Sequence, residues 1–159
     1  MTRLYARCPG GGRIHEGAPQ GHWKVLTTLG AMSLDGMVAS MTVESATDSD
    51  VFEAFLEQVL CSKLKPGDVV VMDNLNVHKM DRGRELIEGA HARLLYLPPY
   101  SPDLNPIEKA WSKFKQFLRS VKARTAEALD LAVSAALQSI SPDNAHAWFR
   151  HCGYGLQQA

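Results

Sequence analysis

Two acidic residues, Asp73 and Glu108, stand where metal-dependent chemistry could occur. Asp73 follows the apolar run 69–72, which a Pro-Gly pair precedes. Such a run predicts a strand buried on both faces, and open α/β sheets place their ligands beyond the carboxyl ends of their strands. Glu108 falls in the first turn of a predicted helix that Asn105 can cap and Pro106 can begin. A pair of carboxylates at a sheet edge can hold Mg²⁺ or Mn²⁺.

A basic surface adjoins the second carboxylate. Between positions 109 and 124, over the predicted helix and the residues just after it, there are six Lys or Arg residues and no acid. Its apolar residues recur at steps of three and four, so the charged residues gather on the opposite face. Such a face could neutralise the phosphates of DNA, although an ordinary solvated helix face also carries charges. The predicted DNA-binding residues are Lys109, Lys115, Arg119 and Lys122.

Each acid taken alone also has a structural interpretation. Asp73 could turn the chain after its strand, and Glu108 could complete a capping box with Asn105. The flanking sequence favours chemistry: 73–79 reads Asp-Asn-Leu-Asn-Val-His-Lys, and 97–108 reads Leu-Pro-Pro-Tyr-Ser-Pro-Asp-Leu-Asn-Pro-Ile-Glu. These two stretches closely resemble the DDE transposases of bacterial insertion sequences, in the mariner-like superfamily. Thirty-four residues lie between the two acids, which is the spacing of that family's second and third catalytic acids.

The resemblance extends over nearly the whole chain and implies both a function and a site. The implied function is that of a transposase catalytic domain for metal-dependent DNA strand cleavage and transfer in DNA transposition. Asp73 and Glu108 would be catalytic ligands of a two-ion Mg²⁺ (or Mn²⁺) site. Asn74, His78 and Asn105 would lie beside it, although His78 has the simpler interpretation of a loop histidine. The implied partners are DNA (transposon ends and target) and a second copy of the chain or an N-terminal transposase fragment.

The sequence pattern predicts a mixed α/β fold. Strands are expected over 23–32, 37–43, 69–72 and 93–97, with the first two in a hairpin and the last two joined by a helix over 82–90. Further helices are expected from Thr47 or Ser49 to 60, from 106 to 121, from 125 to 140 and from 141 to 149, before a loose tail. This order is that of a ribonuclease-H-like mixed sheet with flanking helices. We expect one domain over 1–159, with an irregular lead-in (1–22), a sheet-and-site core (23–121) and C-terminal helices (125–150).

One element of that fold has no counterpart among the predicted elements. The resemblance implies a first strand that carries the first catalytic aspartate and lies between the hairpin and the Asp73 strand. Asp35 is no substitute, because an Asp-Gly turn has its own backbone reason, and Asp48 and Asp50 mark a helix start. We therefore expect a partial, C-terminal piece of a DDE catalytic domain, from a truncated copy that is inactive alone. The alternative is a non-catalytic remnant that only binds DNA or a transposase partner.

The composition disfavours several other classes of protein. The 159 residues have zero net charge, so any contact with DNA must come from local clustering of cations. The three cysteines are far apart and form no CxxC motif, which argues against a zinc module. A nucleotide-binding domain is disfavoured because no Gly-rich phosphate loop follows any strand. No apolar run of membrane-spanning length or signal peptide is visible, which predicts no membrane partner and a cytoplasmic protein, associated with the nucleoid when it binds DNA.

Overall fold

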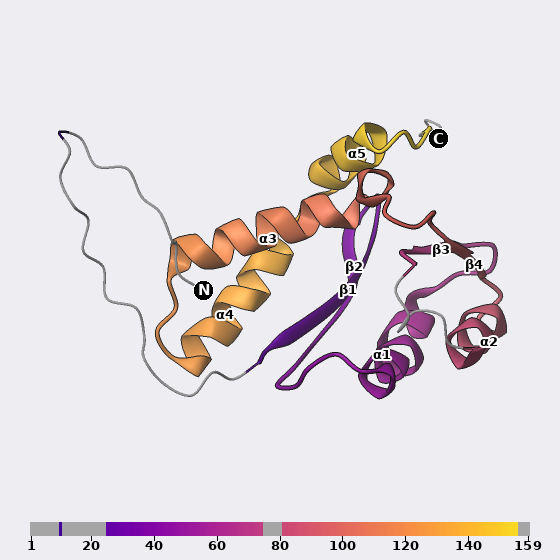
Figure 1. Cartoon of the computed structure of the whole chain (residues 1–159), viewed down its shortest axis with the longest axis horizontal. Coiled ribbons are helices and arrows are strands. Elements are labelled where there is room, and N and C mark those ends of the chain that lie inside the picture. Colours follow the sequence, from indigo (N-terminus) through magenta and orange to yellow (C-terminus); the bar gives the residue numbers. More distant parts are fainter. Residues whose placement is uncertain (1–9, 11–24, 75–80, 156–159) are drawn as a thin grey trace.

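The computed structural model describes residues 10, 25–74 and 81–155. Its strands lie between two groups of helices, with α1 and α2 on one side and α3 and α4 on the other (Figure 1). The elements in chain order are β1 (Thr27–Ser33), β2 (Gly36–Val43), α1 (Ser49–Phe55), β3 (Val69–Met72), α2 (Asp81–Gly89), β4 (Arg93–Tyr96), α3 (Ile107–Val121), α4 (Ala126–Gln138) and α5 (Pro142–His151). No helix in these ranges is long and apolar enough to cross a membrane.

The first two strands form the predicted hairpin. β1 and β2 pair antiparallel from Thr27 opposite Val43 to Ser33 opposite Gly36, with an irregularity in the register after Ala31. Gly36 has a φ of 101°, and a Cβ at this position would lie 2.7 Å from the backbone oxygen of Ile140. Only glycine combines that backbone conformation with so close an approach. The hairpin tip is therefore fitted against the junction between α4 and α5.

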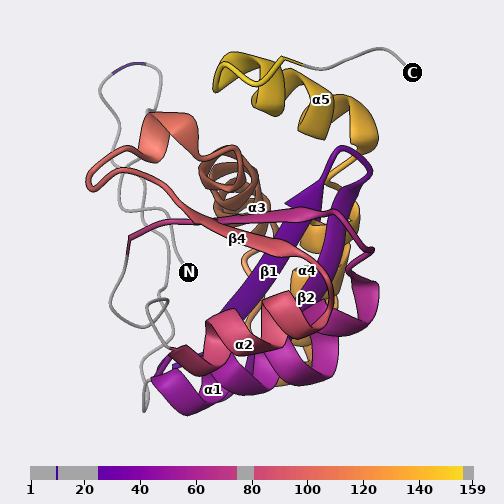
Figure 2. The ribbon, with the colours of Figure 1, turned by 90° about the vertical axis from the view of Figure 1, so that its right-hand side faces the viewer.

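The predicted βαβ unit is also confirmed. β3 pairs parallel with β4, from Val69 opposite Arg93 to Met72 opposite Tyr96, and α2 connects the two strands. Burial along β3 rises from an exposed Val69 to a buried Met72, so the expected burial on both faces holds only at its carboxyl end. Among the described residues the hairpin and the βαβ unit form two separate sheets, and Figure 2 shows the two strand pairs running in different directions.

The helix after the hairpin differs from the expected one at both ends. Its cap is Asp48, whose carboxylate accepts a hydrogen bond from the Val51 N–H, and not Thr47 or Ser49. Beyond Phe55 the chain continues as a π-helical segment (Leu56–Leu60) and a 3₁₀ turn (Cys61–Lys63). The apolar side chains still face inward, so the periodicity identified the buried face correctly, although it could not distinguish the helix types.

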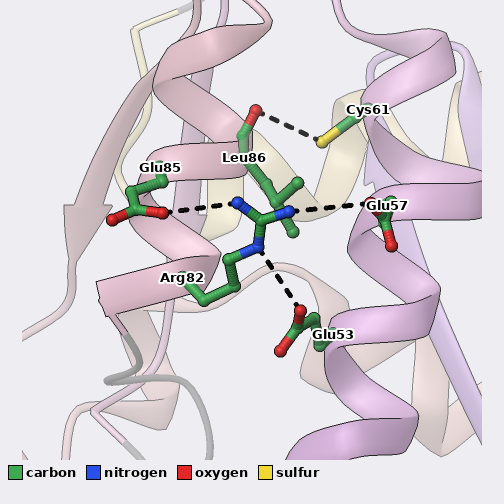
Figure 3. A network of polar contacts seen from close by, with 6 residues as sticks. All are labelled: Glu53, Glu57, Cys61, Arg82, Glu85 and Leu86. Atoms are coloured by element: carbon green, nitrogen blue, oxygen red, sulfur yellow. Dashed lines mark hydrogen bonds and ion pairs between the residues drawn. The ribbon is translucent and has the colours of Figure 1, made fainter.

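Ion pairs join α2 to this helix. The guanidinium of Arg82 lies 3.4 Å from Glu53, 3.7 Å from Glu57 and 3.4 Å from Glu85, as Figure 3 shows. These contacts, the hydrogen bond with Glu85 first, raise the pKa of Arg82. Because the side chains are exposed, the pairs add little stability, and their main effect is to orient α2. A nearby Cys61 thiol donates to a backbone carbonyl of α2.

The two C-terminal helices begin where the sequence predicted, and each has a side-chain cap. The Thr125 hydroxyl accepts from Ala128 N–H at the start of α4, and Ser141 forms a capping box with Asn144 at the start of α5. The segment after α5 is not the loose tail expected, as far as it is described. There Tyr154 stacks edge-on against Phe149, 5.4 Å away, and donates a hydrogen bond to the Leu104 carbonyl at 3.0 Å.

Two hydrophobic clusters hold these layers together. The first joins the strands to α1 and α2, and the second joins α3 to α4. The buried members of the first cluster are Ala39, Phe52, Phe55, Leu56, Leu60, Met72, Ile87 and Ala92, and those of the second are Phe114, Leu118, Ala132, Val133 and Ala136. The space between the two clusters is where the candidate site lies.

Candidate active site

A cavity of about 570 Å³ opens between β1 and β3. The residues of β1 from Thr28 to Ser33 form one wall, and β3 with Asp73 forms the other. Apolar side chains from the α1 side and from α3 close its two faces, including Phe52, Phe55 and Trp111. The volume is in the range typical of ligand-binding sites in proteins. Both predicted catalytic carboxylates line this one cavity.

Asp73 reaches the cavity because β3 ends there. The residue directly follows the buried Met72 and is half-buried, as is Asn74. The Leu97 N–H donates to the Met72 carbonyl at 2.8 Å, which extends the pairing of β3 and β4 by one residue. This bond brings the start of the proline-rich loop alongside Asp73. The carboxylate therefore lies at the carboxyl edge of the parallel pair, where α/β sheets place their ligands.

Glu108 reaches the cavity from the first turn of α3. The expected capping by the Asn105 side chain is wrong, because α3 begins at Ile107 with Pro106 as its cap and no side-chain cap bond. The backbone carbonyl of Asn105 accepts the Glu108 N–H at 3.2 Å instead, since a 3₁₀ turn (Pro102–Leu104) leads directly into the helix. Asn105, half-buried, lines the cavity beside the exposed Glu108.

Three contacts that the sequence did not reveal fix the position of α3. Trp111, one turn after Glu108, packs on Gly30 in β1, where an added Cβ would lie 3.0 Å from the indole. The Lys113 ammonium donates to the Ser139 carbonyl and to the Asn144 side chain, which ties α3 to the α4–α5 junction. The hydrogen bond from Tyr154 holds the loop before α3. In the sequence, the position of Lys113 at the border of the apolar face was the one sign that its side chain could contact a neighbouring helix.

Two carboxylates fit part of a metal site. Mg²⁺ is usually held by one or two carboxylates together with water and substrate phosphates, so Asp73 and Glu108 suit one hard cation. Within residues 25–74 and 81–155, no group of three or more His, Cys, Asp or Glu could hold a metal ion. Asp35 borders the same cavity, but it is exposed in the hairpin turn, as expected. His78 lies outside the described residues.

Comparison with known protein families identifies the family of the chain. Residues 1–130 match the family model described as the DDE superfamily endonuclease. The chain belongs to this family. One curated relative is the transposable element Tc1 transposase of Caenorhabditis elegans, which is 32% identical over 79 residues. These residues cover 50% of this chain and 29% of that protein. The Tcb2 transposase of Caenorhabditis briggsae is 32% identical over 101 residues, covering 61% and 37%.

Solved structures agree with the ribonuclease-H-like fold. The Mos1 strand transfer complex matches with a TM-score of 0.70 at 15% identity, over 96% of this DDE chain and 46% of that chain. The Mos1 mariner paired-end complex with Mn matches with a TM-score of 0.71 at 14% identity, over 96% and 47%. The chain thus spans about half the length of the solved transposase chains and roughly a third of the curated relatives.

The cations on α3 of the DDE chain fall into two groups. Lys109, Lys115 and Arg119 are exposed, and Lys115 and Arg119 share the helix face of Glu108 because seven and eleven residues are close to whole numbers of turns. Lys122 is half-buried and caps α3 in the left-handed conformation, with φ 54°. The exposed face thus carries a row of positive charge that begins near the cavity, whereas Lys122 has a backbone role at its end.

Proposed function

We propose that the chain is a transposase catalytic domain, acting in metal-dependent DNA strand cleavage and transfer, and that it does not cleave DNA alone. The observation that carries the proposal is the convergence of Asp73 and Glu108 on one cavity, from the end of β3 and the head of α3. Membership of the DDE superfamily endonucleases supports the same chemistry. The curated relatives come from nematodes, so a bacterial insertion sequence as the source stays a prediction.

In this proposal the chain's own residues bind and orient rather than transfer protons. Mg²⁺ or Mn²⁺, when bound, would supply Lewis-acid activation of the water or DNA hydroxyl that attacks a phosphodiester. Asp73 and Glu108 would hold the ion through their carboxylate oxygens. Lys115 and Arg119, further along the same face of α3, would neutralise phosphates of the bound strand and align it with the cavity.

A second candidate function is a DNA-binding remnant without catalysis. It is favoured by one observation, the restriction of the metal-ligand set to two carboxylates among the described residues. A site that activates and stabilises both oxygens of an in-line displacement uses two ions, which need more ligands than this pair offers. The two candidates share the basic face of α3 and differ in whether metal binding is coupled to DNA.

The coupling of metal to DNA separates the two candidates. The affinity of the chain for a short DNA duplex is measured by fluorescence anisotropy at constant ionic strength, with and without Mn²⁺. The proposed function predicts tighter binding with Mn²⁺ and loss of that gain in Asp73→Asn/Glu108→Gln. A matched control is Asp50→Asn, which removes an exposed acid at the start of α1. An equal gain in all three proteins would contradict the proposed site.

Cleavage itself is tested on supercoiled plasmid with Mg²⁺ or Mn²⁺. We expect no nicking above background by the isolated chain. Robust nicking that Glu108→Gln abolishes would contradict the expected inactivity and would retain the catalytic assignment. Nicking that survives this substitution would contradict the assignment of Glu108.

A further inference from the structure

We propose that Tyr154, just beyond α5, is a positioning residue for Glu108 and acts on it through the backbone of the loop before α3. The Tyr154 hydroxyl donates a hydrogen bond of 3.0 Å to the carbonyl of Leu104, fifty residues earlier in the chain. In the proposal this bond keeps Glu108 where it can share a metal ion with Asp73. The inference rests on the proposed function, because it assigns a further residue to the same metal site.

The end of α5 fixes the position of the tyrosine. Gly153 has a φ of 85°, and its N–H donates to the Arg150 carbonyl at 3.0 Å. The Tyr154 N–H donates to the Phe149 carbonyl, also at 3.0 Å. Together these two bonds form a Schellman motif, which ends the helix and reverses the chain. The Tyr154 ring therefore stacks edge-on against Phe149, with 5.4 Å between the ring centroids, and its hydroxyl is held at a defined place.

The carbonyl that accepts this hydrogen bond belongs to the peptide unit between Leu104 and Asn105. The N–H of the same unit donates to the Pro102 carbonyl at 3.1 Å, so both of its polar groups are bonded. The next carbonyl, that of Asn105, accepts the Glu108 N–H at 3.2 Å. α3 has no side-chain cap, and the first N–H groups of a helix have no partner within the helix. The orientation of this peptide unit therefore determines whether the Glu108 N–H keeps its acceptor.

The residue two positions before Tyr154 also lies beside the stretch that contains Glu108. Burial raises the pKa of the Cys152 thiol, while the charge of Lys109 lowers it and the charge of Asp103 raises it. The thiol is thus within electrostatic reach of residues on both sides of Glu108. Tyr154 itself lines the same cavity as Glu108. The segment after α5 is therefore placed to support the site as well as the fold.

The alternative is that Tyr154 only stabilises the fold, and Tyr154→Phe separates the two roles. This substitution removes the hydroxyl and leaves the ring against Phe149. Because Leu104 is exposed, water can bond its carbonyl in place of the hydroxyl, so denaturant melts should change little. The direction of the bond is lost, however, because water is not fixed to α5. A positioning role therefore predicts a larger effect on metal affinity than on stability.

The first measurement is the affinity of the full chain for Mn²⁺ alone, from the electron paramagnetic resonance signal of free Mn²⁺. Groups that orient metal ligands contribute about 10–100-fold to metal affinity. Since Tyr154 acts through the backbone, we expect the lower end, about tenfold weaker binding in Tyr154→Phe. The matched control is Ser120→Ala, which removes a hydroxyl that donates to the Phe117 carbonyl near the far end of α3. This control should keep the Mn²⁺ affinity of the unmodified chain.

Two further measurements distinguish positioning from a general loss of structure. In a Glu108→Gln background, Tyr154→Phe should weaken Mn²⁺ binding by less than about twofold, because the ligand that it positions is already removed. A purely structural role would weaken binding equally in both backgrounds. Without metal, amide hydrogen exchange followed by NMR should be faster at Asn105 and Glu108 in Tyr154→Phe and unchanged in α4.

The outcomes separate this inference from the proposed function. Unchanged Mn²⁺ affinity in Tyr154→Phe, with weaker binding in Glu108→Gln, would overturn this inference alone. An equal loss in both backgrounds, or a loss without faster exchange at Asn105 and Glu108, would also overturn it. If Glu108→Gln leaves the Mn²⁺ affinity of the chain unchanged, the proposed metal site is wrong, and the positioning role is overturned with it.

Discussion

Replacing Lys115 and Arg119 together by alanine removes two exposed cations from the face of α3 that carries Glu108. If both side chains contact phosphates, the double variant releases two fewer counterions when it binds DNA. Each neutralised phosphate contributes about 0.9 to the slope of log affinity against log salt concentration, so the slope should flatten by about 1.8. Between 50 and 200 mM salt, that difference corresponds to about a 12-fold smaller loss of affinity than in the unmodified chain.

The assay is fluorescence anisotropy with a short duplex of arbitrary sequence at several salt concentrations. Two controls accompany it. Arg84→Ala removes an exposed cation of α2 that forms an ion pair with Glu88, so it changes the net charge without altering α3. Lys113→Met removes a cation of α3 whose ammonium is bound to Ser139 and Asn144. This second variant should lose about 1–3 kcal/mol of unfolding free energy and keep the salt slope.

The slope comparison can refute the reasoning directly. An unchanged slope in the double variant would assign this face of α3 to solvent or to another protein. A flattening as large in Arg84→Ala would mean that overall charge, rather than the position of Lys115 and Arg119, governs binding. Weaker binding with an unchanged slope would point to a loss of structure instead of lost phosphate contacts.

Three further predictions concern the elements that position the site. Gly30→Ala places a methyl group 2.5 Å from the side-chain end of Met37 and 3.0 Å from the indole of Trp111, so the unfolding free energy should fall by about 1–3 kcal/mol and Trp fluorescence should shift. Gly36→Ala should lower the free energy of unfolding by about 2 kcal/mol or more in denaturant melts, since φ is 101° and the added methyl group meets a backbone oxygen. The control Gly89→Ala should not destabilise the chain, because its methyl group meets nothing within 4 Å. Burial is the main cause that raises the pKa of the Cys152 thiol above its value in the unfolded chain. The folded state therefore keeps the thiol protonated to higher pH than the unfolded state, and the free energy of unfolding should fall as pH rises above about 8.5.

Short-range signals predicted most of the local structure. The hairpin followed from its Asp-Gly turn, and the βαβ unit followed from two apolar runs that flank a helical segment. The starts of the last two helices at Thr125 and Ser141 could be predicted because helix starts depend on residues within one turn. At the head of α3 the same reasoning was wrong, because the backbone of the preceding 3₁₀ turn took the place of the Asn105 side chain.

Long-range contacts were beyond the sequence. In the sequence Lys113 is one of six cations between positions 109 and 124, yet its partners come from the α4–α5 junction, more than twenty residues away. Gly30 is an unremarkable strand residue until Trp111 packs against it. The two carboxylates were found through the motif that surrounds them. Their meeting at one cavity depends on how α3 is docked on the hairpin, which no local pattern encodes.

The most direct test of the central claim is the location of a bound Mn²⁺ ion on the isotopically labelled chain. Paramagnetic broadening of backbone amide resonances is recorded at substoichiometric Mn²⁺. We expect the amides of residues 72–74, 105 and 107–109 to broaden first, and we expect Asp73→Asn/Glu108→Gln to abolish this effect while the rest of the spectrum stays that of the folded chain. Broadening that centres elsewhere, or that persists unchanged in the double variant, would contradict the claim that Asp73 and Glu108 form one metal-binding site.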